Sequence, residues 1–192
     1  METVLVTIRG VAPTIMQSDA LVNPLGEAAK RMKAINAKKT AKTDDDREEQ
    51  AAIEYRASLY WDRELGPYWP AANIARCIKD GAKLTRQGTN VDRGLEVVSD
   101  INPLQYDGPR DPKGLLANPD FIDCRSVKIK TSRVMRTRPI FKHWQLSFQL
   151  MYDPGIFQDR ETVRSIIESA GRYIGLSTYR PRFGRFEIVA FK

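Results

Sequence analysis

The stretch that decides the fold is Trp144-Gln145-Leu146-Ser147-Phe148-Gln149-Leu150, in which apolar and polar side chains alternate. A period of two is typical of a strand that buries one face. The same alternation occurs near the start of the chain, where Val4, Val6 and Ile8 share one face. We therefore expect strands over residues 4–9, 95–98, 126–137, 144–150 and 183–191, with a turn at residues 139–142.

Helices are predicted between these strands. The acidic run at residues 44–49 suits a helix N-terminus and predicts a helix over 44–58. A second helix is predicted to begin at Pro70 and to end before Gly88. For the third, Asp159 is the expected N-cap, apolar residues recur at helical spacing as far as Ile174, and Gly175 lies just past the end.

The resulting order is β-α-β-β-α-β, which is that of a ferredoxin-like, RRM-like α+β domain. Its antiparallel sheet is covered on one face by helices, so the other face is free to bind a ligand. Residues 1–192 are expected to form one domain, with a helical insertion after the first strand at about 19–66 and a second insertion at about 100–120. The breakers in 66–70 predict a rigid turn, and the prolines in 102–119 predict a loop.

Composition excludes several classes of protein. The chain has 192 residues and a formal charge of +7, with 42% hydrophobic and 29% charged residues, as in a globular protein. Cys77 and Cys124 lack the spacing of metal ligands, and His143 is the only histidine, so we expect no metal and no cofactor. Without a long apolar run or a signal peptide, a cytoplasmic location with no membrane partner is expected.

Positive charge is concentrated near the C-terminus. Residues 125–152 and 171–192 together hold twelve basic residues and one acidic residue. Because like charges repel, this concentration indicates a polyanionic partner such as nucleic acid, and the alternative is a solvated strand face. The predicted nucleic-acid-binding residues are Lys128, Lys130, Arg133, Arg136, Arg138, Lys142, Tyr179, Arg180, Arg182 and Arg185.

The segment from Gly175 to Phe186 combines glycines, arginines and aromatic residues. The glycines permit close backbone approach, the arginines offer forked donors to phosphates, and Tyr179 and Phe183 could stack on unpaired bases. This combination favours a single strand over a duplex. The alternative is a helix cap followed by a loop whose aromatic residues fill the core.

Evidence for catalysis is thin. His143 is a candidate general acid or base, and Asp19 could position a metal or a ribose hydroxyl, but a structural or surface role is the simpler interpretation of both. The chain contains no phosphate-binding loop, nucleophile elbow or zincin motif. An NTPase, a serine hydrolase and a zincin therefore have no support.

The first strand running into Gly10-Val-Ala-Pro13, the helical insertion, the hairpin at 126–151 and the loop from Gly175 to Phe186 resemble the RAMP superfamily of CRISPR systems. The similarity is to the backbone subunits that polymerise along guide RNA, or to a small phage- or prophage-encoded relative. It implies that the sheet and loops grip a single strand, while the insertion and hairpin touch neighbouring subunits. In some members an aspartate after the first strand cuts target RNA, and Asp19 lies in a comparable place.

Three functional hypotheses follow. The first is a non-catalytic protein that binds single-stranded nucleic acid, RNA rather than DNA, and assembles into a homo-oligomer or a ribonucleoprotein with several subunits. The second is a structural or assembly protein, such as a virion or regulatory component, whose basic face docks an acidic protein. The third is a metal-assisted ribonuclease that uses Asp19 or His143.

Overall fold

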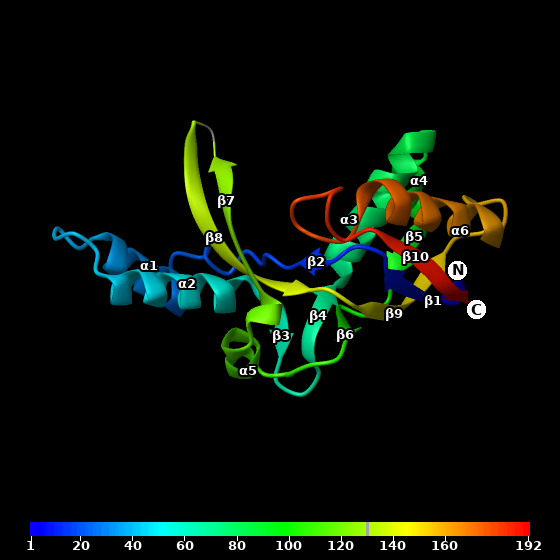
Figure 1. The fold of residues 1–192 in the computed structure, drawn as a ribbon. Helices are drawn as coiled ribbons and strands as arrows, with labels where there is room; N and C mark the ends of the chain where they lie inside the picture. The colour runs from blue at the N-terminus through cyan, green and yellow to red at the C-terminus, as the bar shows by residue number, and fades with distance from the viewer. Residues whose placement is uncertain (130) are drawn as a thin grey trace.

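The computed structural model describes residues 1–129 and 131–192, and it has a mixed α+β architecture in which all pairs of strands are antiparallel (Figure 1). The described residues include six α-helices: α1 (Glu27–Asn36), α2 (Asp44–Ser58), α3 (Ala71–Ala82), α4 (Gly88–Gly94), α5 (Pro112–Ala117) and α6 (Arg160–Ser169). Short 3₁₀ turns cover Lys83–Thr85 and Pro119–Phe121, and a π-helical turn, Ala170–Ile174, extends α6.

The larger sheet is built around the two strands with the clearest alternation. Strands β1 (Glu2–Gly10) and β9 (Gln145–Tyr152) pair along their whole length, from Glu2↔Tyr152 to Arg9↔Gln145. The strand order is β10-β1-β9-β6-β4-β3, and β5 also pairs with β9. The remaining strands are β10 (Phe186–Phe191), β6 (Ile101–Gln105), β4 (Gly66–Pro70), β3 (Trp61–Asp62) and β5 (Leu95–Val97).

Helices α3 and α6 lie on one face of this sheet (Figure 1). Their apolar sides join the inward side chains of β1 and β9 in one core, to which Val6, Ile78, Phe148 and Ile167 belong. The opposite face of the sheet, predicted to bind a ligand, carries mainly uncharged side chains. Arg9 on that face pairs with Glu187 at 2.6 Å. The sheet face is therefore not where the basic residues gather.

A second structural unit projects from the sheet. Strands β7 (Ile122–Ile129) and β8 (Ser132–Phe141) form a long hairpin, and the end of β8 pairs with β2 (Thr14–Ile15). Helices α1 and α2 form an arm beside it, and the hairpin rises from this arm (Figure 1). The loop between α6 and β10 reaches toward the hairpin from the other side.

The structure confirms the expected strands at both ends of the chain and the expected helices over 44–58 and after Asp159. The helix expected from Pro70 to before Gly88 is also present, as α3, and it ends at Ala82. The predicted turn at 139–142 is wrong. Strand β8 continues to Phe141 because its end pairs with β2 (Ile15↔Ile140), and the hairpin partner of β8 is β7. Strand β9 pairs with β1, β5 and β6 instead, so the predicted hairpin of strands 126–137 and 144–150 does not form.

Other predictions are corrected as well. Residues 66–70 and 101–105 are the paired strands β4 and β6, not a turn and a loop. The sheet tolerates Pro103 because the β6–β9 ladder begins only at Leu104. The insertion expected at about 19–66 contains, besides the predicted helix α2, the unpredicted helix α1, which packs on α2 and is linked to it by an Arg31–Glu49 ion pair of 2.8 Å.

Candidate nucleic-acid interface

The loop of residues 175–184 is closed at its neck by two glycines. Gly175 and Gly184 have φ of 88° and 77°, which other residues rarely adopt, and the Leu176 N–H donates to the Gly184 carbonyl at 2.8 Å. A Cβ on Gly184 would lie 2.4 Å from the Leu176 oxygen. The two glycines therefore allow the two sides of the loop to lie close together.

The same loop is anchored to β2. The Thr178 N–H donates to the Ile15 carbonyl at 3.0 Å, and the Thr14 hydroxyl donates to the Leu176 carbonyl at 2.6 Å. The Gly184 N–H donates to the Pro13 carbonyl at 2.7 Å. Because β2 pairs with β8, these bonds hold the loop beside the base of the β7–β8 hairpin.

Hairpin and loop enclose a concavity of about 450 Å³, here called the hairpin hollow. Four of its lining residues are cationic, and the described lining contains no carboxylate. Five of the predicted binding residues therefore come together in one place. The lining residues are Gln17, Ser126, Val127, Lys128, Arg133, Arg136, Arg138, Thr178 and Tyr179.

Two of the four cations are paired with carboxylates that lie behind the hollow. Arg136 donates to the Glu54 carboxylate of α2 at 2.5 Å. Arg138 donates to Asp123 at 3.1 Å, and its side chain is only 4% exposed. The positive charge of the C-terminal strands is thus partly neutralised by residues outside the basic run.

Lys128 and Arg133 are different, since both are exposed and stand directly opposite each other across the two strands. Within the described part of the chain, neither lies within ion-pair distance of a carboxylate, and Arg133 donates only to the Ser126 hydroxyl at 3.2 Å. Like charges in directly opposed positions destabilise a sheet. An anion bound between them would remove this repulsion.

The other predicted binding residues lie elsewhere. Lys142 pairs with Asp120 at 2.6 Å, and Arg180 lies 3.6 Å from Asp80 of α3. Arg182 and Arg185 are exposed but do not line the hairpin hollow. Lys130 lies outside the described residues.

Of the two aromatic residues in the loop, only Tyr179 is available to a ligand. Its side chain is 51% exposed, whereas Phe183 is 8% exposed and is buried with Ile15 and Ile140. Phe183 therefore belongs to the core, as the alternative interpretation of this loop allowed.

The two catalytic candidates are exposed and line different hollows. Asp19 lines one with Val22 and Asn23, and His143 lines another with Asp107 and Lys142. No group of three potential metal ligands occurs among the described residues.

Burial raises the pKa of the Cys77 thiol to about 12, which suppresses its nucleophilic thiolate. The geometry thus offers no pair of groups for acid–base chemistry between Asp19 and His143.

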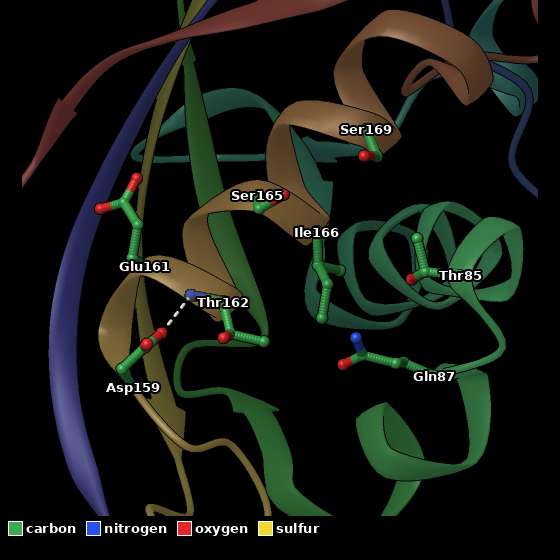
Figure 2. A pocket seen from close by; sticks show the side chains of 8 residues that line it. All are labelled: Thr85, Gln87, Asp159, Glu161, Thr162, Ser165, Ile166 and Ser169. Atoms are coloured by element: carbon green, nitrogen blue, oxygen red, sulfur yellow. Dashed lines mark hydrogen bonds between the residues drawn. The ribbon is translucent and has the colours of Figure 1, made fainter.

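A further hollow lies between α6 and the segment that joins α3 to α4 (Figure 2). Its charged lining residues are the carboxylates Asp159 and Glu161, so it does not suit a polyanion. Asp159 caps α6 by accepting from the Thr162 N–H at 2.6 Å, as the sequence predicts. Its role there is structural.

Sequence reasoning missed Gln17 and Thr178 in the hollow, and it missed the carboxylates that neutralise two of the arginines. Asp123 could have been found, because it precedes Arg125 by two residues and so shares its face of the strand. Glu54 comes from a helix far away in sequence, and no local pattern points to it.

A scan against protein-family models found no match to this chain, and a search of the curated proteins found no relative. Among the described residues, no helix is long and apolar enough to cross a membrane. The inference about function therefore rests on the geometry and charge of the hairpin hollow.

Proposed function

We propose that this protein binds single-stranded nucleic acid, RNA in preference to DNA, through the hairpin hollow and without catalysis. The observation that carries the proposal is the pair formed by Lys128 and Arg133, which face each other without a carboxylate among the described residues nearby. Phosphate groups are the natural counter-charge for such a pair.

Two features support an unpaired RNA strand as the ligand. The exposed ring of Tyr179 at the hollow suits a base that is free to stack, which a base inside a duplex is not. The polar side chains of Gln17, Ser126 and Thr178 in the same lining can form hydrogen bonds with a ribose 2′-hydroxyl.

We also propose that the larger sheet with α3 and α6 is a ferredoxin-like domain and that the chain is a RAMP-type protein that oligomerises along its ligand. The order β10-β1-β9, followed by β5 and β6 beside β9, supports the domain assignment, with α3 and α6 as the two crossover helices. The projecting hairpin and helical arm are the surfaces that neighbouring copies would contact.

The test is charge reversal in the hollow. A Lys128→Glu/Arg133→Glu variant should bind a labelled single-stranded RNA at least about tenfold more weakly at low salt, because two phosphate contacts become repulsive. The matched control is Arg63→Glu/Lys113→Glu, which makes the same charge change at exposed positions outside the hollow.

Thermal melts would establish that both variants fold. Equal weakening by the two variants would show a purely non-specific charge effect, and unchanged RNA affinity in the hollow variant would contradict the proposal. The second outcome would make an acidic protein surface the better candidate partner for the basic hairpin.

A further inference from the structure

We propose that the hairpin hollow is a subsite for one unpaired nucleotide, whose phosphate is bound by three of the cations that line it, Lys128, Arg133 and Arg138, and whose base stacks on Tyr179. This inference rests on the proposed function and deepens it by naming the recognised unit, a nucleoside phosphate. It differs from a simple basic patch because it requires the sugar phosphate and the base to be bound together.

One hydrogen-bond donor of the hairpin hollow has no partner in the described part of the protein. The Arg138 side chain is only 4% exposed and lines the hollow, yet its Nε has no hydrogen-bond partner. The Arg138 Nη1 donates to Gln17 Oε1 at a long distance of 3.4 Å. A buried guanidinium usually has its donors satisfied, so the buried Nε is a free donor for a ligand oxygen atom once a small shift of the side chain exposes it.

The Tyr179 ring is an aromatic surface that the protein itself holds in place. The Tyr179 ring lies 5.9 Å from the Phe183 ring, which in turn lies 4.6 Å from the Arg125 guanidinium. Tyr179 also has a φ of 59°, an uncommon value for a bulky residue, and the hydrogen bond from Thr178 to Ile15 holds the chain beside it. These contacts fix the position of the Tyr179 ring, whose exposed side is left for a base.

The volume of the hairpin hollow matches the size of a nucleotide. A volume of about 450 Å³ is within the range of small-molecule sites and suits one nucleotide. The cations line the hollow on the hairpin side and Tyr179 lines it on the loop side. This arrangement separates the group that recognises the phosphate from the group that recognises the base.

The experiment compares adenosine 5′-monophosphate with ribose 5-phosphate, which has the same sugar and phosphate but no base. Each compound is titrated into the full chain and binding is followed by the amide NMR signals of residues around the hollow. We expect the nucleotide to bind about fivefold or more tightly than ribose 5-phosphate, the increment that a stacked base supplies.

Variants at Tyr179 test whether its ring causes the difference in affinity between the nucleotide and ribose 5-phosphate. In Tyr179→Asn, the nucleotide and ribose 5-phosphate should bind equally, since asparagine lacks the ring but tolerates a positive φ. Tyr179→Phe should keep the ratio. The subsite is refuted if the two compounds bind wild type equally, or if the ratio survives in Tyr179→Asn.

These failures are distinguishable from failure of the proposed function. Equal binding of the two compounds, together with RNA binding that depends on Lys128 and Arg133, would overturn the subsite and leave the proposed function standing. Failure of RNA itself to bind wild type would overturn both.

Discussion

At the scale of single residues, the sequence could not separate exposed arginines from arginines that are buried and paired with a carboxylate. Arg138 and Arg133 belong to the same basic run, yet Arg138 is buried against Asp123 and Arg133 is exposed. The difference arises because α2 and β2 pack against the base of β8 and leave its tip uncovered. Residue type and period-two alternation do not reveal which part of β8 is covered by α2 and β2.

The buried pair gives a stability prediction. Arg138→Met should lower the free energy of unfolding by about 3 kcal/mol, because it removes the buried partner of the Asp123 carboxylate. Arg125, which also donates to Asp123, keeps the loss from being larger. Urea denaturation of the variant and wild type would measure the difference.

The double variant Asp123→Asn/Arg138→Met is the control, and it should recover part of the lost stability because no uncompensated charge stays buried. A loss under about 1 kcal/mol in the single variant would show that the pair contributes no more than an exposed salt bridge does.

At the scale of elements, local periodicity predicted β1, α3 and α6 because each buries one face against the core, whereas α2 was predicted from the acidic residues at its N-terminus. It failed at β4, β6 and the end of β8, where prolines suggested breaks. There, tertiary pairing decides the structure: Pro103 lies opposite Tyr68 of β4, and Pro139 lies opposite Ile122 of β7. Helix α1 was missed because its sequence is mostly polar and its support comes from α2.

The contacts of Glu54, which link α2 to β8 and are here called the brace, give a prediction at this scale. Glu54 accepts from the Thr137 N–H at 2.9 Å as well as from Arg136. Glu54→Ala leaves that buried N–H without its acceptor, so we expect a loss of about 2 kcal/mol in stability. The Thr137 amide should also exchange its hydrogen much faster.

The control for this prediction is Glu48→Ala, at an exposed position of the same helix, which should change neither stability nor exchange appreciably. If amide exchange accelerates equally in the hairpin and in the β1–β9 ladder, the brace acts on the whole molecule and not on the hairpin.

At the scale of the whole molecule, the hydrophobic core and the residues proposed to bind the ligand lie in different parts. The larger sheet and its helices supply the core, and the face of the sheet that the helices leave open is mainly uncharged. The hairpin and the loop of residues 175–184 bring the exposed cations Lys128 and Arg133 and the exposed Tyr179 to one hollow. The sequence located this charge correctly along the chain, but only the pairing of β2 with β8 shows that the hairpin and loop form one surface.

The most direct test of this account is fluorescence anisotropy of labelled single-stranded RNA, single-stranded DNA and duplex DNA of equal length, titrated with wild-type protein at about 50 mM and about 200 mM salt. We expect RNA to bind most tightly, and its affinity to fall about tenfold or more between the two salt concentrations if three phosphates are contacted. Duplex binding equal to or tighter than that of the single strands, or an affinity for RNA that salt does not change, would contradict the assignment of the hairpin hollow to an unpaired strand.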